Sequence, residues 1–296
     1  MYKRFYGLTR NPFELSPDPY FYYPTPLHNE AFATLNYCVV RRKGFVVVTG
    51  EVGTGKTLLL RCLLDALNRN QIASALINNP RLSVSEFLAY LLADLRLPLT
   101  GGTKGQMLSQ LNNYLLVRSQ RGTTTVLVVD EAHLLSWELL EEMRLLTNFE
   151  TSQHKLLQIV LVGQPELDRK IDSEELRQLK QRIAMRCRLE PLGLNELQGY
   201  IRRRLELAGA NSHGVTIFSD EAIEAIHRFC CGIPRLANTL CENSLISGYG
   251  RQAKQVTADI VRQVAADLRL NLAPEPFVPK PERLEERQNV ARAMSK

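Results

Sequence analysis

Long apolar runs are missing from this chain of 296 residues. No uninterrupted apolar stretch approaches the roughly 20 residues that a membrane-spanning helix needs. The first seven residues, Met-Tyr-Lys-Arg-Phe-Tyr-Gly, are not followed by the apolar segment of a secretory signal. We therefore expect no membrane span in this chain and a cytoplasmic location, with any attachment to a membrane made through a partner.

Metal-binding cysteine patterns are absent as well. The six cysteines form no C-x-x-C pair and show no Cys/His spacing typical of a zinc site. Several fall on apolar faces, where a free thiol behaves as a small hydrophobic side chain. We expect all six to be reduced, as in a cytoplasmic protein. They are Cys38, Cys62, Cys187, Cys230, Cys231 and Cys241.

No large excess of one charge is present, because the net charge is only +6. A basic balance is compatible with nucleic acid or acidic lipid, and equally with the surface of a protein that binds a polyanionic nucleotide. The densest basic run, Arg202-Arg203-Arg204, lies in an expected helix, so its side chains point in different directions. Charge alone leaves nucleic-acid binding open.

The clearest motif joins a buried-strand pattern at 45–49 to an apolar helix pattern at 58–67. Between them stands Gly50-x-x-x-x-Gly55-Lys56-Thr57, in the strand–loop–helix order of a phosphate-binding P-loop. Its glycines let backbone N–H groups surround anionic oxygens, and the helix N-terminus adds positive potential.

This P-loop predicts bound ATP and Mg²⁺. Lys56 is placed to reach the β- and γ-phosphates, and the Thr57 hydroxyl to hold Mg²⁺. The expected nucleotide-binding residues are Gly50, Glu51, Val52, Gly53, Thr54, Gly55, Lys56, Thr57 and Leu58.

A second buried run, 124–129, ends in Asp130-Glu131. Residues at the carboxyl end of a parallel strand face the ligand crevice. Asp130 would hold Mg²⁺ through water, and Glu131 would activate the attacking water as general base, as in a Walker B motif. The alternative is that the two acids only cap the helical stretch that follows.

A further strand pattern, 156–162, leads into Gly163-Gln164-Pro165. A polar side chain at this point would lie beside the P-loop, so Gln164 is a candidate sensor of the γ-phosphate or the attacking water. The alternative is a turn residue before Pro165. Next along the chain, 174–188 reads as a basic helix.

Residues 1–30 are rich in aromatic side chains and proline. Eight of the twenty Phe and Tyr residues fall in the first 23 positions. The prolines rule out long helices, and the aromatic side chains should pack onto the domain that follows. The segment can also wall the base pocket, although plain packing is the simpler interpretation.

Strand and helix patterns alternate through the first two thirds of the chain, and from about Leu192 the pattern is helical throughout. We expect an α/β domain followed by a small all-α domain. The tail contains four prolines among mixed charges, typical of a linker. The expected division is an N-terminal segment at 1–30, a nucleotide-binding domain at 31–190, a helical lid at 191–270 and a tail at 271–296.

Taken in order, these motifs resemble those of the AAA+ ATPases, and more closely their ExeA-like branch, the A-type ATPases of general secretion pathways. The resemblance covers about residues 1–270. It implies a three-layer αβα P-loop domain with a parallel sheet and an all-α lid. The matching motifs are Phe5-Tyr6-Gly7-Leu8, Asn11-Pro12-Phe13, Pro17-Asp18-Pro19, the P-loop, Val128-Val-Asp-Glu-Ala-His133, Leu161-Val-Gly-Gln-Pro-Glu-Leu167, Gln181-Arg-Ile183 and Gly232-Ile-Pro-Arg235.

The resemblance also assigns roles to two arginines. Arg182 matches an arginine that reaches the γ-phosphate of a neighbouring subunit, and Arg235 matches one that senses the phosphate from the lid. A guanidinium can neutralise charge spread over the transferring phosphoryl oxygens. Arg186, one helical turn beyond Arg182 in the expected helix, is the reserve candidate. For Arg182 and Arg235 alike, the alternative is a surface or ion-pairing residue.

Three functions are compatible with these features. The main hypothesis is an ATPase that hydrolyses ATP at subunit interfaces to assemble or remodel a protein partner of secretion or envelope machinery. It would act as a homo-oligomer, a ring or helix with roughly six or seven subunits per turn. One alternative is a DNA-binding transposition-regulator ATPase. The other is a slow nucleotide-dependent oligomerisation switch.

Overall fold

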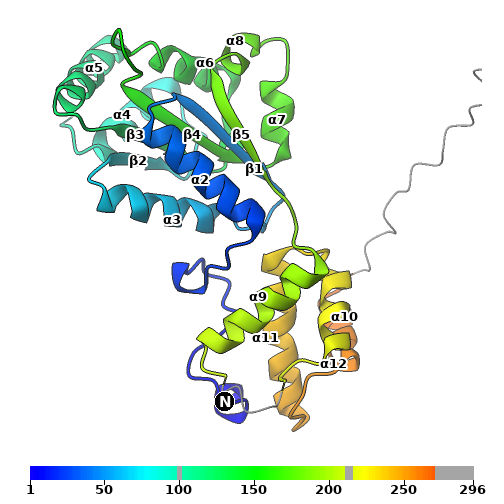
Figure 1. Cartoon of the computed structure of the whole chain (residues 1–296). Helices are drawn as coiled ribbons and strands as arrows, with labels where there is room; N and C mark the ends of the chain where they lie inside the picture. Colours follow the sequence, from blue (N-terminus) through cyan, green and yellow to red (C-terminus); the bar gives the residue numbers. More distant parts are fainter. Residues whose placement is uncertain (99–101, 211–215, 271–296) are drawn as a thin grey trace, which may run out of the picture.

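The computed structural model describes residues 1–98, 102–210 and 216–270. It contains an α/β part built on a sheet and a second part built from helices (Figure 1). The chain passes between these parts twice, once before the helix at Pro26–Val40 and once after the last strand. The tail expected at 271–296 lies outside the described residues.

The sheet of the α/β part has five parallel strands in the order β2-β3-β4-β1-β5. Every residue of β1, β3 and β4 is buried, because these strands have a neighbour on each side and helices on both faces. Since all the strands are parallel, their carboxyl ends meet at one edge. The strands are β1 (Phe45–Gly50), β2 (Ala73–Ile77), β3 (Thr125–Val129), β4 (Leu157–Gly163) and β5 (Ile183–Leu189).

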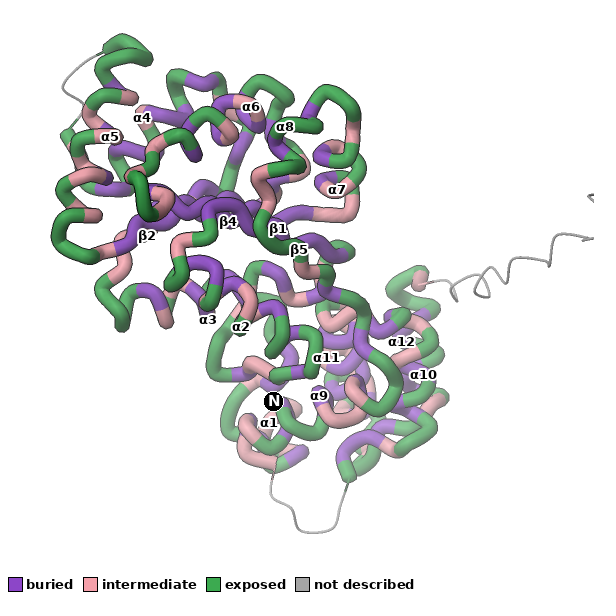
Figure 2. Tube along the Cα trace, turned by 45° about the horizontal axis from the view of Figure 1, so that its top comes forward, coloured by how far each residue is buried: buried purple, intermediate pink, exposed green. Residues whose placement is uncertain are grey.

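Helices cover both faces of this sheet, as Figure 2 shows by the buried strands between exposed helix surfaces. One face packs on α2 (Pro26–Val40) and α3 (Lys56–Arg69). The other packs on five helices, in one apolar cluster that includes Phe87, Leu111 and Leu140. The expected αβα architecture with a parallel sheet is confirmed. The five helices are α4 (Val84–Asp94), α5 (Lys104–Gln120), α6 (Trp137–Leu146), α7 (Pro165–Ile171) and α8 (Arg177–Lys180).

Polar caps fix where several of these helices begin. Ser83 accepts a hydrogen bond from the backbone of Glu86, whose side chain accepts one in return from the backbone N–H of Ser83, and α5 has the same arrangement between Thr103 and Gln106. Thr25 caps α2, which starts with Pro26 in its first turn, where the missing N–H costs nothing.

The helical part has an apolar core of its own. It consists of α9 (Leu194–Leu207), α10 (Asp220–Cys230), α11 (Pro234–Gly250) and α12 (Ala258–Asp267). No helix in the described ranges is both long and apolar enough to cross a membrane.

The N-terminal aromatic residues join the core of the helical part, so the expectation that they pack onto the domain that follows them is wrong. Tyr6, Phe13 and Phe21 are buried among its helices, and the Tyr2 hydroxyl donates to Glu242 at 2.8 Å. Both faces of the sheet already have helical cover, whereas four short helices leave apolar surface that the N-terminal segment fills. That segment includes α1 (Tyr2–Phe5) and the 3₁₀ turn η1 (Pro19–Phe21).

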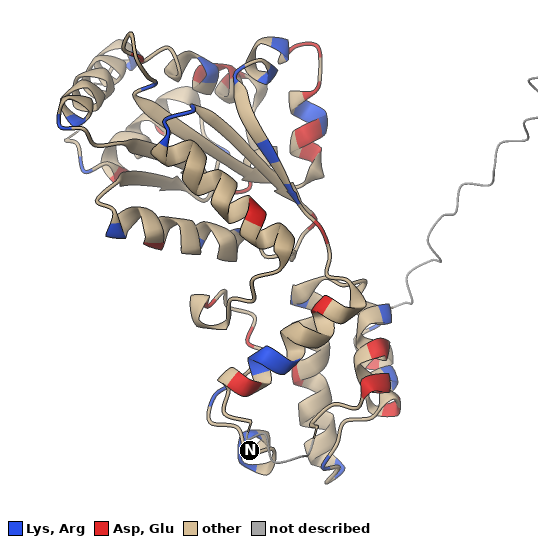
Figure 3. Ribbon diagram, viewed as in Figure 1, with Lys and Arg blue, Asp and Glu red and all other residues tan. Residues whose placement is uncertain are grey.

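The basic helix expected at 174–188 is also wrong. The structure has the short α8 followed by β5, which pairs in parallel with β1. β5 is the edge strand, so most of its side chains are exposed and it needs no continuous apolar run. Figure 3 shows basic residues along this strand, beside α7 with charges of both signs.

Candidate functional site

The P-loop, residues 50–57, joins the end of β1 to the start of α3. Gly53 and Gly55 have left-handed backbones, with φ of 83° and 100°. A Cβ on Gly53 would lie 2.8 Å from the Cβ of Arg235, and one on Gly55 would lie 3.0 Å from His28 Nε2. Both glycines are therefore required by the backbone conformation and by close packing from outside the loop.

Lys56 lies buried in the curve of the loop. Its Nζ donates to the carbonyl oxygens of Gly50 at 2.7 Å and Glu51 at 2.8 Å. Burial lowers the pKa of this ammonium, while the carboxylates of Glu131 and Asp130 act in the opposite direction. An ammonium has three N–H donors, so these two contacts leave one for a phosphate oxygen.

Thr57 and Asp130 form the candidate metal site. The Thr57 hydroxyl donates to Asp130 Oδ2 at 3.1 Å, and Asp130 Oδ1 accepts the backbone N–H of Glu131 at 2.9 Å. Burial raises the pKa of Asp130, and these two hydrogen bonds oppose the shift. A hydroxyl and a carboxylate are the hard oxygen donors that Mg²⁺ prefers, so the residues fit the expected ion.

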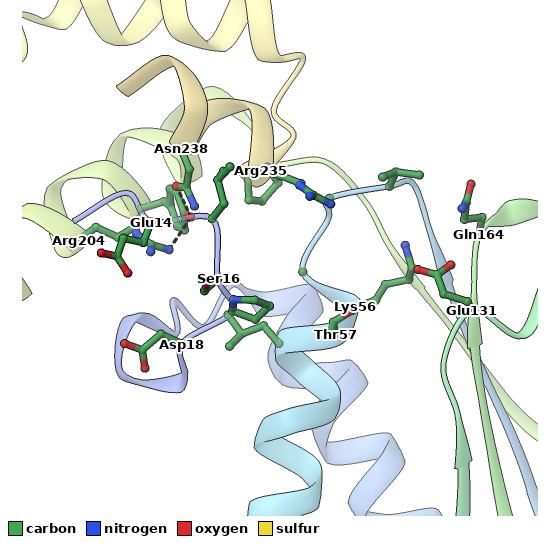
Figure 4. A pocket seen from close by; sticks show the side chains of 18 residues that line it. Glu14, Ser16, Asp18, Lys56, Thr57, Glu131, Gln164, Arg204, Arg235 and Asn238 are labelled. Atoms are coloured by element: carbon green, nitrogen blue, oxygen red, sulfur yellow. Dashed lines mark hydrogen bonds between the residues drawn. The ribbon is translucent and has the colours of Figure 1, made fainter. Parts of the chain in front are cut away.

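Glu131 follows β3 with a φ of 52°. A left-handed backbone is costly for a residue with a side chain, and such strain is concentrated at functional sites. The Glu131 side chain is 44% exposed. It points toward the same space as Lys56 (Figure 4).

Gln164 stands where β4 ends and α7 begins, on the same sheet edge as Glu131. Its Nε2 lies 3.1 Å from His133 Nε2. Its side chain lines the same cavity as Lys56 and Glu131 (Figure 4).

A cavity of about 230 Å³ lies between the P-loop, the strand ends, the N-terminal segment and the helical part. It is therefore walled by both parts of the molecule (Figure 4). Its lining includes the expected site residues Val52, Gly53, Gly55, Lys56, Thr57, Leu58, Glu131, Gln164 and Arg235, together with Glu14, Leu15, Ser16, Pro17, Asp18, Tyr200, Arg204, Pro234 and Asn238.

Arg235 brings the helical part to the P-loop. It lies in the first turn of α11, and its backbone N–H donates to the carbonyl of Gly53 at 3.3 Å. Any movement of the helical part relative to the sheet would therefore change this contact with the P-loop.

Arg182 does not join this cavity. It directly precedes β5, at the amino-terminal end of the strands, whereas the P-loop lies at their carboxyl ends. Its Nη1 donates to Thr147 Oγ1 at 2.9 Å. Arg186 lies within β5, not one helical turn beyond Arg182, and it pairs with Asp168 and Asp172 at 3.4 and 3.2 Å. Neither arginine reaches the P-loop of its own chain.

Residues that the sequence did not assign to the site also line or support the cavity. His28 of α2 lies beneath the P-loop, with Nε2 3.1 Å from the carbonyl oxygen of Thr54. Arg204 is 4% exposed and donates to the Tyr200 hydroxyl at 2.8 Å, which in turn donates to Asn238. A pattern of residue types gives no signal for such contacts, because they depend on how distant segments pack.

Comparison with known proteins agrees with this geometry. Residues 40–171 match the family described as AAA domain. Over 257 residues the chain is 42% identical to general secretion pathway protein A of Aeromonas hydrophila, an alignment that covers 86% of this chain. The chain spans about half of that relative, 46% of its length.

Solved structures with similar folds include Cdc6p from Pyrobaculum aerophilum, with a TM-score of 0.65 and 18% identity over 86% of this chain and 70% of that one. For Drosophila ORC bound to DNA the TM-score is 0.61 and the identity 21%, over 89% of this chain and 67% of that one. For the RuvB Holliday junction branch migration motor of Thermotoga maritima the TM-score is 0.53 and the identity 20%, over 82% of this chain and 69% of that one. At these identities the likeness establishes the fold alone.

The chain therefore contains an AAA domain over residues 40–171, which include the P-loop. Over most of its length it is similar to general secretion pathway protein A, as its sequence motifs predicted.

Proposed function

We propose that this chain binds ATP with Mg²⁺ in the cavity beside the P-loop and hydrolyses it. The observation that carries the proposal is the convergence of Lys56, Glu131 and Gln164, from three different strand ends, on one cavity that Arg235 reaches from the helical part. A structural turn would not need a buried lysine, a strained acid and an amide around a shared space.

The reaction follows from the placement of these groups. A water oxygen attacks the γ-phosphorus while Glu131 accepts a proton from that water. The bond from the γ-phosphorus to the bridging oxygen breaks, and ADP leaves with that oxygen and its electron pair. Lys56 and Arg235 would offset the charge on the phosphoryl oxygens. Thr57 and, through water, Asp130 would hold Mg²⁺, which neutralises charge on the β- and γ-phosphates.

The site is incomplete within one chain under this proposal. Arg182 lies at the flank of the α/β part, away from its own P-loop, and its guanidinium donates to Thr147 Oγ1 at 2.9 Å. We place it against the nucleotide of a neighbouring copy, so that an oligomer forms the complete site.

The biological role is proposed from the relative. General secretion pathway protein A is named for a secretion pathway, and this chain matches part of it. We therefore propose that hydrolysis drives assembly or remodelling of a protein partner of secretion or envelope machinery. Six free cysteines support a reducing, cytoplasmic location.

Calorimetric titration with ATP and Mg²⁺, followed by measurement of phosphate release, tests the proposal. We expect binding and turnover, and no binding would contradict it. Repeating the rate measurement with duplex DNA at low and moderate salt separates a secretion-type ATPase from a DNA-dependent one, because DNA contacts weaken steeply with salt. Binding with almost no turnover, at any protein concentration, would instead favour the nucleotide-operated switch.

A further inference from the structure

His133 stands between the two residues that the proposed reaction uses to activate and sense the attacking water. Its Nδ1 lies 3.4 Å from Glu131 Oε2. Its Nε2 lies 3.1 Å from Nε2 of Gln164. The two ring nitrogens therefore face the acid at the end of β3 and the amide at the end of β4.

The backbone of His133 is fixed from the side of β4 and α7. Its carbonyl oxygen accepts from Lys170 Nζ at 3.0 Å. Its backbone nitrogen lies so near Gly163 that a Cβ there would approach within 3.1 Å. The side chain is only 12% exposed. The ring consequently has little freedom to leave the space between its partners.

Two arrangements of the ring hydrogen are compatible with these contacts. When Nε2 accepts from the Gln164 amide, Nδ1 carries the hydrogen and faces Glu131. When Nδ1 accepts the backbone N–H of Gln164, 3.5 Å away, the hydrogen lies on Nε2. Only the first arrangement gives the Glu131 carboxylate a hydrogen-bond donor.

We propose that His133 is a positioning residue that orients the Glu131 carboxylate and couples it to Gln164. The inference rests on the proposed ATP hydrolysis. Because Glu131 is half exposed, its contact with the ring adds little to stability, and the consequence of the contact is orientation. If the Gln164 amide turned toward a γ-phosphate, Nε2 of His133 would lose its partner. The contact between the ring and the Glu131 carboxylate would then change.

The first test compares His133→Ala with the parent in ATP affinity and in turnover. We expect the Kd for ATP to stay within about threefold, since the P-loop contacts remain, while kcat falls by about 10²-fold through misorientation of the base. His133→Asn places an amide N–H near the position of Nδ1 and should recover part of kcat. The matched control is His154→Asn, an imidazole at the other end of the sheet that contacts Ser119, and it should turn over like the parent.

A mutant cycle then asks whether His133 acts through Glu131. In a Glu131→Gln background, His133→Ala should lower kcat by less than about twofold, because the base it orients is already lost. A full and independent loss in that background would overturn the inference. So would a His133→Ala protein with the turnover of the parent, or an Asn variant no better than Ala.

The parent protein separates the two proposals. A parent that hydrolyses ATP and loses turnover on Glu131→Gln, but not on His133→Ala, overturns the role of His133 alone. A parent that binds ATP without releasing phosphate overturns the proposed hydrolysis and, with it, this inference.

Discussion

At the scale of single residues, the conformation of Glu131 favours the proposed general base over the alternative of a helix cap. Its φ of 52° is unfavourable for any residue with a Cβ, and the side chain makes no cap hydrogen bond to the turn that follows. The carboxylate instead lies toward Lys56 and the cavity. A position that tolerates strain to aim a carboxylate is the pattern expected of a general base.

Glu131→Gln should therefore bind ATP with nearly parental affinity, because Lys56, Thr57 and the loop amides are unchanged. Its phosphate release should fall by about 10²–10⁴-fold, since an amide cannot accept the proton of the attacking water. Single-turnover phosphate release together with calorimetry measures both. Parental turnover in Glu131→Gln would remove the acid from catalysis.

Lys56→Ala is expected to fail one step earlier. Removal of the ammonium takes away a charge-assisted contact to the phosphates, so ATP binding itself should be lost or much weakened. Calorimetry is the direct measurement, and a melting curve without nucleotide shows whether the variant is folded. Binding at the parental affinity would contradict the P-loop assignment.

Sequence patterns located those candidate site residues that follow a predicted strand directly. The P-loop, Asp130, Glu131 and Gln164 all follow strands at one sheet edge, which alternation of strands and helices implies. His28 and His133 were not identified as site residues, because a lone histidine in a helix or turn gives no periodic or spacing signal. Their roles depend on contacts with Thr54 and with Gln164, which only the fold supplies.

At the scale of elements, α2 supports the P-loop through His28. The Thr25 hydroxyl contacts Nδ1 of this ring at 2.7 Å, and Nε2 faces the Thr54 carbonyl. This arrangement suits a neutral ring with the proton on Nε2. Burial lowers the pKa of His28 from its ordinary 6.5.

The sign of the pH effect follows from that shift. Below a pH of about 6.5, His28 is protonated in the unfolded chain but stays neutral in the folded protein until the pH reaches its lower folded pKa. The unfolded state therefore binds more protons in this range. We expect stability to fall as the pH drops from 7 through 6.5 and to level off below the folded pKa. Melting temperatures across pH should show a smaller drop for His28→Gln, whose amide donates to Thr54 without titrating. Equal slopes for the two proteins would contradict this role.

Gly53 links the P-loop to α11. An alanine there combines a φ of 83° with a Cβ 2.8 Å from Arg235 and 2.9 Å from Ile233, so the helical part must move away. We expect a cost of about 1–2 kcal/mol in stability and markedly weaker ATP binding.

The matched control is Gly105→Ala in the first turn of α5, where nothing lies within 4 Å of the added Cβ. It should be neutral or slightly stabilising, because alanine is the better helix former. Urea unfolding and calorimetry compare the two variants. Equal ATP affinity of the two variants would show that the contact between the helical part and the P-loop is unimportant for ATP binding.

Element boundaries show where sequence patterns stop being sufficient. The all-helical pattern after about Leu192 was predicted from the sequence, since the apolar spacing of α10 and α12 reflects a buried face. β5 was predicted as helix because an edge strand is exposed on much of its surface and carries alternating arginines. In residues 174–188, the charged residues fit an exposed helix and an edge strand equally well. Only the pairing with β1 identifies the strand.

At the scale of the whole molecule, the proposed nucleotide site lies between the two parts. The α/β part supplies the P-loop and the helical part supplies Arg235 to the lining of the cavity. The N-terminal segment also lines the cavity, and its aromatic side chains are buried in the helical core. The two parts have separate apolar clusters, and the cavity between them gives a physical route for bound nucleotide to move one part against the other.

The proposed reaction still lacks one positive charge within a single chain. Arg182 precedes β5 at the sheet edge away from the P-loop, so it cannot serve its own nucleotide. An arginine supplied by a neighbouring subunit can be worth about 10³–10⁵ in turnover. Activity per chain should therefore rise with protein concentration, and a rate strictly proportional to concentration over the range of assembly would contradict a shared site.

The most direct measurement mixes two inactive variants. Arg182→Ala should bind ATP nearly normally and hydrolyse it poorly. Lys56→Ala keeps Arg182, but its own P-loop should bind ATP weakly or not at all. When the two proteins are combined, we expect phosphate release well above the sum of their separate rates, because in the proposed shared site Arg182 of one chain would complete the site of the other. No gain in rate, with mixed assemblies demonstrated by a tagged pull-down, would contradict an ATPase site shared between subunits.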